Sequence, residues 1–476
     1  MTTKIQIKTK ASFSIISLNQ AQSDRRLDAE YYDPEYLRII KILKDKKSQK
    51  VKDAFKIKVF SGPFGSFFKS ENYLSEGHPF IRISDISDFF LDKEKMVFVC
   101  DDDFVKLKKY QLSIGDIVFS KIGTVGRLSI ITEEIGKVAI SENNIGLAFQ
   151  TIIDQIDKAY IAFFLLSDFG QKQIFRLASG NVQLKLNVSD IENILIPQAS
   201  IEIKKSLKNT LEIVHEKLLQ SQKSYKEAVQ LLMRNINLGE YKTSNKNTST
   251  RLLSDCLAGN RFDAEYWLPD FDVIIAKVSK YKNGVSTIGD EFKQLKGNFK
   301  SEKGIDYNYV EIGDVNVSSG EIGHNLVTSA ELPANAKIKL GKKQLITSKV
   351  RPNRGATAIL DNHEGYIASG AFTVLVEEDN INLETLMVYL KAKPIRELLL
   401  RYNTGTSYPV ITDTDVLKLP IPLLDKALQK KISELVNISA NERREAKQLL
   451  EKSKRAVEIF IEQDEKAALQ ILNLTN

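Results

Sequence analysis

Arg26-Leu27-Asp28-Ala29-Glu30-Tyr31 returns 235 residues later as Arg261-Phe262-Asp263-Ala264-Glu265-Tyr266. Other landmarks repeat in the same order, at offsets that shrink only to 225: Ser120-Lys121 recurs as Ser348-Lys349, and Ile196-Pro197 recurs as Ile421-Pro422. The chain is therefore an internal duplication. Two related modules in one chain predict two related targets.

The bulk composition permits a nucleic-acid partner but does not require one. The chain has 476 residues, enough for two or three domains, and a formal net charge of +7. Its two cysteines, Cys100 and Cys256, lie far apart, and its four histidines form no cluster with ligand spacing. This pattern suits a reducing compartment and argues against a zinc or iron site. No apolar run of membrane-spanning length and no basic-plus-apolar leader occur, so we expect a cytoplasmic protein without membrane contact.

Each copy presents the same order of predicted elements. Pro34 and Pro269 stand at the predicted first position of a short helix. A mostly β segment follows, in which short apolar runs at 117–119 and 128–131 predict strands. One helix around residues 160–176, matched at 383–402, comes next, and each copy ends on Ile-Pro and a long charged helix.

The two long charged helices share one seam. Mostly apolar or small residues recur in alternating steps of four and three, which is coiled-coil spacing, and the faces between them carry Lys, Glu, Gln and Arg. The second set repeats the first at a constant offset of 225: Leu207, Leu211, Val214, Leu218, Ser221, Tyr225, Ala228 and Leu232, then Ile432, Val436, Ser439, Arg443, Ala446, Leu450, Ser453 and Val457. Matching seams most simply pack against each other as an antiparallel pair. A segment without apolar residues, 242–250, reads as a flexible linker between the copies.

The most distinctive local sequence is Gly-Asp-Ile-Val-Phe-Ser-Lys-Ile-Gly-Thr-Val-Gly-Arg at 115–127. As a functional loop it would present Lys121 and Arg127, with glycines that let the backbone approach phosphate. As a structural element it would be an ordinary turn between strands. The second copy favours the functional interpretation, because it rebuilds the turn yet keeps three cations, Lys349, Arg351 and Arg354.

Two further loops offer side chains that could contact DNA. The polar loop after the 160–176 helix carries Asn181, Gln183 and Lys185, and its counterpart carries Asn403 and Ser407. Such side chains can form paired hydrogen bonds with base edges, although an ordinary solvated loop has the same composition. A third segment, 67–73, interleaves aromatic and basic residues and contributes Lys69; core aromatics beside surface lysines are the alternative.

No catalytic constellation is found in the sequence. The carboxylates of the repeated Asp-Ala-Glu-Tyr motif lie two apart, but the motif leads into a predicted helix start, where acids are favoured by capping and by the helix dipole. Asp270 with Glu291 and Lys293 imitates a metal-dependent nuclease pattern, yet the first copy lacks it. No Walker loop, nucleophile elbow or Asn-Pro-Pro-Tyr methylation motif occurs.

With these features together, the chain resembles the specificity subunit of Type I restriction-modification enzymes over almost its whole length. The resemblance rests on the duplicated module, the 115–127 stretch, Ser141-Glu142-Asn143, the Arg-x-Asp-Ala-Glu-Tyr openings, and the Ile-Pro that precedes each heptad helix. The second copy departs from the pattern, with Gly341-Lys342-Lys343 before its strand and Arg-Pro-Asn-Arg in place of the glycine turn. The two modules should therefore read different half-sites.

The resemblance implies an α+β fold: two tandem β-rich target-recognition domains separated by two long antiparallel coiled-coil helices. The expected boundaries are 1–200 for the first domain, 201–240 for the first helix, 241–250 for the linker, 251–425 for the second domain, and 426–476 for the second helix and tail. The implied partners are double-stranded DNA, two methyltransferase subunits that dock on the helices, and motor-nuclease restriction subunits. S-adenosylmethionine, ATP and magnesium are expected on those partners, with no cofactor, metal or catalytic residue on this chain. The alternatives are a duplicated coiled-coil adaptor without a DNA role and a metal-dependent nuclease.

Overall fold

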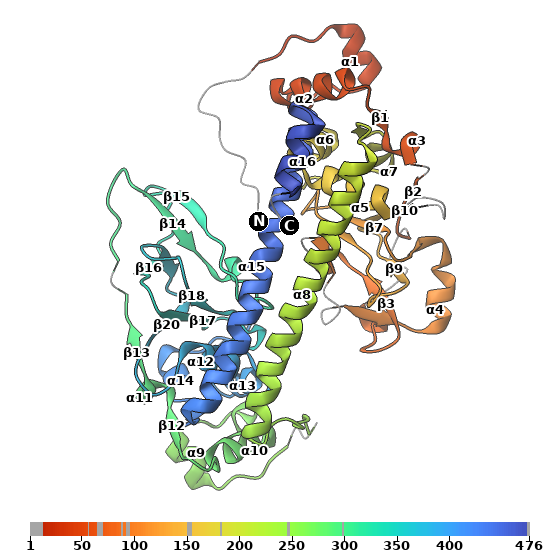
Figure 1. The fold of residues 1–476 in the computed structure, drawn as a ribbon. Coiled ribbons are helices and arrows are strands. Elements are labelled where there is room, and N and C mark those ends of the chain that lie inside the picture. Colours follow the sequence, from red (N-terminus) through yellow and green to blue (C-terminus); the bar gives the residue numbers. More distant parts are fainter. Residues whose placement is uncertain are drawn as a thin grey trace. The chain divides into compact units, whose positions relative to one another are not determined.

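The computed structural model of the chain describes residues 13–55, 57–63, 70–86, 89–91, 96–149, 155–180, 183–244, 248–297 and 299–473. They form two compact units (Figure 1). The first module comprises Thr2–Leu218 and Arg444–Asn476, and the second comprises Leu219–Arg443. The division falls inside the two longest helices, α8 (Ile201–Asn235) and α15 (Lys426–Glu462), so each module contains a part of both.

The first module contains two sheets. In spatial order, the larger consists of β2 (Ile57–Ser61), β10 (Asn144–Phe149), β7 (Ile117–Ser120), β8 (Leu128–Ile130) and β4 (Phe89–Phe90). The smaller consists of β5 (Val97–Val99), β3 (His78–Ile81), β9 (Val138–Ile140) and β6 (Gln111–Leu112), and β1 (Gln49–Lys50) pairs separately with β11 (Leu195–Ile196). All four residues of β7 are buried, because this strand lies inside the sheet with both faces covered. Burial on both faces explains why 117–119 is a continuous apolar run rather than an alternating one.

The second module repeats this plan. Its sheets are β13 (Phe292–Leu295), β20 (Phe372–Glu377), β17 (Gln344–Ser348) and β18 (Thr357–Leu360), then β15 (Asn325–Thr328), β14 (Asp306–Val310), β19 (Ile367–Ser369) and β16 (Ala336–Lys339); β12 (Val285–Thr287) pairs with β21 (Pro420–Pro422). In each module one four-stranded sheet contains a parallel pair, β3 with β9 in the first module and β14 with β19 in the second. The prediction of two related β-rich modules is thus confirmed.

Shorter helices flank the sheets of both modules. In the first module they are α1 (Leu18–Asp24), α2 (Pro34–Asp45), α3 (Val51–Phe55), α4 (Asp101–Lys106), α5 (Gln155–Leu166), α6 (Asp168–Leu177), α7 (Val188–Glu192) and α16 (Glu465–Asn473). In the second they are α9 (Leu253–Gly259), α10 (Pro269–Ser279), α11 (Ile288–Glu291), α12 (Leu383–Lys391), α13 (Lys393–Leu399) and α14 (Asp413–Leu417). Proline opens α2 and α10, as the sequence predicts. Among the described residues, no helix combines the length and apolar character needed to cross a bilayer.

The prediction of a single helix at 160–176 is wrong, because the structure has two helices there. Ser167 separates α5 from α6: its hydroxyl donates to the carbonyl of Phe164 at 2.6 Å and accepts the N–H of Gly170 at 3.4 Å. This is the behaviour of a helix N-cap. The counterpart at 383–402 also breaks, at Ala392, before the Lys-Pro pair that opens α13.

The seam residues of the two long helices are buried or half-buried in both modules. In the second module, Ala228 and Leu232 of α8 share a core with Ile432 and Val436 of α15. In the first module, Leu207 shares a core with Ala456 and Val457. Within each module, earlier residues of α8 pair with later residues of α15, which is antiparallel packing: Lys217 contacts Glu445 at 2.6 Å in the first module, and Ser221 contacts Ser439 at 3.0 Å in the second.

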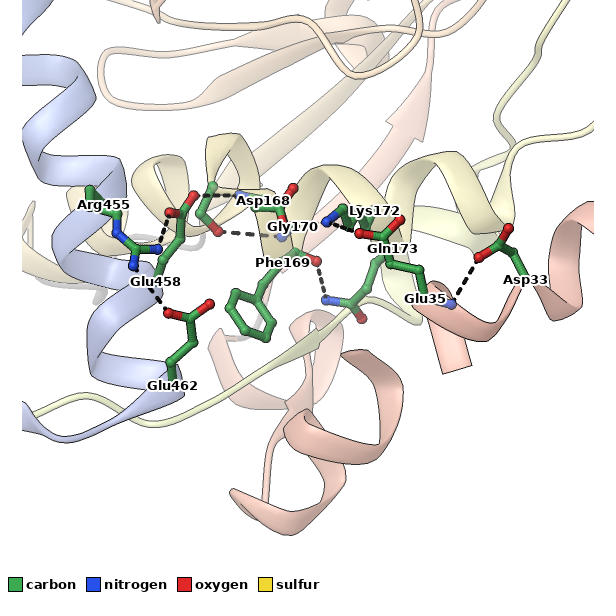
Figure 2. Close-up of polar contacts among 11 residues, drawn as sticks. Asp33, Glu35, Asp168, Phe169, Gly170, Lys172, Gln173, Arg455, Glu458 and Glu462 are labelled. Atoms are coloured by element: carbon green, nitrogen blue, oxygen red, sulfur yellow. Dashed lines mark hydrogen bonds and ion pairs between the residues drawn. The ribbon is translucent and has the colours of Figure 1, made fainter. Parts of the chain in front are cut away.

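Figure 2 shows how the first module holds its part of α15. Glu458 accepts the N–H of Asp168 at 2.9 Å, so a carboxylate of α15 caps the start of α6. Arg455 holds Glu458 in turn, at 3.1 Å. On the opposite side of α6, Lys172 bridges Asp168 at 2.6 Å and Glu35 of α2 at 2.5 Å. This network ties α15 to two helices of the first module.

Candidate nucleic-acid interface

In the first module, two of the predicted loops are joined by backbone hydrogen bonds. The turn after β7 and the loop after α6 meet where Leu186 donates its N–H to the carbonyl of Lys121 at 2.9 Å. Gly123 donates to the carbonyl of Leu184 at 3.1 Å. From the sequence we expected two separate loops that could contact DNA, and the structure brings them together into one surface.

Glycine is required at the corner of this turn. Gly126 has φ of 91°, and its carbonyl accepts a hydrogen bond from the side chain of Gln171 on α6 at 3.0 Å. A Cβ added at Gly126 would lie 2.6 Å from the Gln171 Oε1 atom. The turn is therefore shaped by close contact with α6, as well as by its own residues.

Lys121 does not project outward as predicted, because it is only 9% exposed. Its ammonium donates to the Ser61 hydroxyl at 2.8 Å and to the Glu142 carbonyl at 3.4 Å. Burial lowers the pKa of Lys121, and the nearby ammonium of Lys185 lowers it further, whereas Glu142 acts in the opposite direction. Lys121 thus lies beneath the loop surface, where it links the turn after β7 to the end of β2 and to the segment before β10.

Three of the other candidates lie nearer to solvent. Gln183 and Lys185 are exposed on the loop after α6, and Arg127 is half-buried where the turn returns to β8. Lys69 and Asn181 lie outside the described residues, so their candidacy stays a prediction.

The second module joins its two corresponding loops in the same way, with different residues. We call this backbone pairing of the two loops the joint. Val350 bridges to Val410, Arg351 donates its N–H to the carbonyl of Pro409 at 2.7 Å, and Ile411 donates to the carbonyl of Lys349 at 3.0 Å. At a 225-residue offset, Val410 and Pro409 correspond to Lys185 and Leu184 of the first module.

Two candidates of the second module are engaged internally. Lys349 forms an ion pair with Asp413 at 2.9 Å, and Asp413 also accepts a hydrogen bond from Thr373 at 2.6 Å. The side-chain amide of Asn403 accepts the N–H groups of Gly405 and Val410, at 2.8 and 2.9 Å. Asn403 therefore organises its loop, and the charge of Lys349 is neutralised by Asp413, which was not among the predicted site residues.

Arg351, Arg354 and Ser407 are exposed at this joint. The guanidinium of Arg351 lies 5.3 Å from the ring centroid of Tyr408, a cation–π distance. Tyr408 was not among the predicted site residues. The loops of the two modules align at an offset of 225, which places Tyr408 opposite Gln183, a predicted site residue. This alignment is the sequence signal that could have identified Tyr408.

The repeated Arg-x-Asp-Ala-Glu-Tyr motif is a structural clamp. Arg26 pairs with both carboxylate oxygens of Asp28 at 2.6 Å and donates to the carbonyl groups of Leu177 and Ala178. The hydrogen bond from Arg26 holds the pKa of Asp28 below its usual value, so Asp28 is a poor general acid. The capping role that we expected for this motif belongs instead to Asp33, which accepts the N–H of Glu35 at 2.8 Å.

The second module has the same clamp. Arg261 pairs with Asp263 at 2.6 Å and donates to the carbonyl of Asn403 at 3.0 Å, and this pairing lowers the pKa of Asp263. Each arginine also stacks on the tyrosine of its motif, at 4.7 Å from the ring of Tyr31 and 4.8 Å from that of Tyr266. Each clamp ties the start of its module to the segment that carries the exposed loop.

The residues of the nuclease-like pattern form no recognisable metal site. Asp270 accepts the N–H of Ser244, and Glu291 is buried at the end of α11. Within the part of the chain that the structure describes, no group of three or more His, Cys, Asp or Glu side chains could hold a metal ion.

Comparison with known proteins identifies the family. The family model described as "Type I restriction modification DNA specificity domain" matches residues 43–228 and 280–451. A Methanocaldococcus jannaschii protein named as the specificity subunit of a type I restriction enzyme, MjaX, is 24% identical over 401 residues, which cover 80% of this chain and 85% of that protein. A second M. jannaschii protein, the type I restriction enzyme MjaVIII specificity subunit, is 26% identical over 193 residues, covering 38% of this chain and 44% of its own. The crystal structure of a type I restriction-modification S subunit from M. genitalium aligns with 87% of this chain and 94% of its own, at 13% identity and a TM-score of 0.38.

Proposed function

The chain belongs to the type I restriction-modification specificity family, whose function is DNA recognition. From that premise we propose which role each module and each long helix has in recognising DNA. Each β-rich module reads one half of a bipartite double-stranded DNA site through its two joined loops. The paired helices α8 and α15 set the distance between the half-sites and dock two methyltransferase subunits. The chain itself catalyses nothing. S-adenosylmethionine, ATP and magnesium bind to the methyltransferase and motor-nuclease partners, and the complex works in the cytoplasm.

The observation that carries the proposal is the repeated joint. The same two loops meet through the same backbone contacts in both modules, at Ile122 with Lys185 and at Val350 with Val410. The exposed side chains around the two joints differ: Arg127, Gln183 and Lys185 in the first, and Arg351, Arg354 and Ser407 in the second. One scaffold with two sets of side chains suits a target whose halves have different sequences.

The first experiment separates recognition from the two alternatives. The purified chain and its complex with the methyltransferase are titrated with duplex DNA at several salt concentrations. We expect sequence-specific, salt-dependent binding by the complex and methyl transfer only when the methyltransferase is present. A complex that binds no DNA would support the adaptor. Magnesium-dependent cleavage by the chain alone, abolished by Asp270→Asn with Glu291→Gln, would support the nuclease.

The second experiment tests the spacing role of the helices. One heptad inserted into each helix keeps the seam in register and adds about 10 Å, at 1.5 Å per residue. DNA rises about 3.4 Å per base pair, so the unread gap between the half-sites should lengthen by up to about three pairs. The half-site sequences should not change. A variant that binds its methyltransferase and keeps the original gap would contradict the spacing role.

A further inference from the structure

In the second module, Arg351 has a backbone conformation that residues other than glycine rarely adopt. Arg351 has φ of 50° and ψ of 52°, the left-handed region. For a residue other than glycine this conformation costs about 1–2 kcal/mol. The hydrogen bond from its N–H to Pro409 and the neighbouring bridge from Val350 to Val410 keep it there.

The first module places glycine at the same position. Gly123 follows the bridging residue Ile122, has φ of 76°, and donates its N–H to Leu184, as Arg351 does to Pro409. The conformation is therefore a property of the shared joint, and glycine satisfies it without strain. The second module has an arginine at a position where glycine would fit without strain.

The residue that faces this position also differs between the modules. Tyr408, which is 46% exposed, faces Arg351 from the opposite loop at 5.3 Å. Its counterpart Gln183 faces Gly123, since a Cβ built there would lie 3.1 Å from the Gln183 amide nitrogen. The two facing positions thus form one pair in each module: Gly123 with Gln183, and Arg351 with Tyr408.

We propose that this pair is a specificity determinant of each module, and that Arg351, held over Tyr408, reads a guanine in the half-site of the second module. The proposal rests on the proposed function, since it needs that module to contact DNA. A guanidinium donates two parallel hydrogen bonds to guanine O6 and N7, which is the commonest specific contact in the major groove.

Three features favour a base edge over a phosphate. The guanidinium lies over the ring of Tyr408, 5.3 Å from its centroid, and a guanidinium positioned by an aromatic ring suits bidentate recognition. Among the described residues, the structure gives the Arg351 guanidinium this ring contact but no hydrogen bond or ion pair, so its donors are available to a ligand. A phosphate contact also needs no strained backbone, because flexible cations provide it equally well.

The test uses the full chain assembled with its methyltransferase subunits. Genomic DNA is methylated by the wild-type complex and by complexes that carry Arg351→Gly, Arg351→Lys or Tyr408→Ala, and the methylated motif is mapped by sequencing. Arg351→Gly keeps the left-handed backbone and removes the guanidinium, so it should fold as well as the wild type. Arg354→Ala removes another exposed arginine of the same turn and serves as the comparison: whatever contact Arg354 itself makes with DNA, the guanine assigned to Arg351 should stay specified in this variant.

The wild-type motif should contain a guanine in one half-site that becomes degenerate in Arg351→Gly. The discrimination at that position should fall roughly 5- to 150-fold, and the other half-site should stay unchanged. Arg351→Lys should not restore it, since an ammonium lacks the planar fork, and Tyr408→Ala should weaken the same position.

Other outcomes overturn the inference in distinguishable ways. A motif unchanged in Arg351→Gly, or a uniform loss of affinity with a salt slope lower by about one, would show that Arg351 is no base reader, while leaving the bipartite function intact. A wild-type complex without any bipartite motif would overturn both the inference and the proposed function.

Discussion

The two modules place one duplicated lysine in different electrostatic settings. Lys121 in the first lies buried under its loop, where burial and Lys185 lower its pKa. Lys349 in the second is paired with Asp413 at 2.9 Å, and the exposed cations stand further along the turn, at Arg351 and Arg354. Duplication kept the strand end and the joint between the loops, but it redistributed the charge around them. A repeated sequence motif therefore predicts the backbone position of a residue, but it does not predict the contacts that its side chain makes.

The clamps are the feature that both modules share, so their removal should give the largest and most equal losses. Arg26→Ala and Arg261→Ala each break charged hydrogen bonds to a half-buried carboxylate and to loop carbonyls. We expect each to lower the free energy of unfolding by about 2–3 kcal/mol, measured by denaturant titration. The exposed Arg38→Ala and Arg354→Ala should change it by less than about 0.5 kcal/mol. A large loss in only one module would show that the clamps are not equivalent.

The lysines should respond unequally. Lys349→Met leaves Asp413 without its cation, and we expect a loss of about 1–3 kcal/mol. Lys121→Met should cost less, because it removes a buried charge whose pKa is already lowered by burial. Asp413→Asn combined with Lys349→Met should recover part of the loss, and a double-mutant cycle measures the coupling. Equal losses for the two lysines would contradict the difference described above.

The left-handed position should give opposite signs in the two modules. Gly123→Ala introduces a side chain in that conformation, and we expect a loss of about 1 kcal/mol in thermal or denaturant unfolding. Arg351→Gly relieves the same strain and should be neutral or stabilising. Gly313→Ala is the control, because Gly313 lacks a positive φ and a Cβ there would meet open space. A loss in both modules would show that the strain at Arg351 is compensated by its contacts.

The smallest expected effect is the acid sensitivity of the clamps. Arginine lowers the pKa of both Asp28 and Asp263 in the folded protein. Each carboxylate therefore contributes stability that is complete above the usual aspartate pKa, near 3.9, and is lost as the pH falls through the lower folded value. Asp28→Asn and Asp263→Asn should each flatten the acid limb of a stability-against-pH curve. An unchanged acid limb in either variant would exclude that clamp as a source of the pH dependence.

The duplication and the helix seam could be predicted from the sequence because both are periodic. A repeat preserves order, and a seam preserves spacing, so Val214, Ala446 and Val457 are buried as the pattern requires. Pro34 and Pro269 likewise mark helix starts that depend only on local geometry.

The interior of the candidate site could not be predicted in this way. Lys121 meets Ser61, and Lys349 meets Asp413, across 60 and 64 residues of chain, and nothing local in the sequence marks either contact. The break at Ser167 is local, but an apolar run continues through α5 and hides it. Pairs such as Arg351 with Tyr408 emerge only when the two copies are aligned loop by loop.

The discontinuity of the first module has a consequence for the order of folding. Its core unites residues from Ile39 to Leu207 with Ala456, Val457, Ile461, Ala468 and Leu472. A ribosome makes those last five more than two hundred residues after α8 begins, and the whole second module is synthesised in between. The second module is contiguous and can complete its core first, whereas the module that begins the chain must wait for the segment that follows residue 443. Truncation near residue 450 should therefore unfold the amino-terminal half of the protein and spare the half next to the cut.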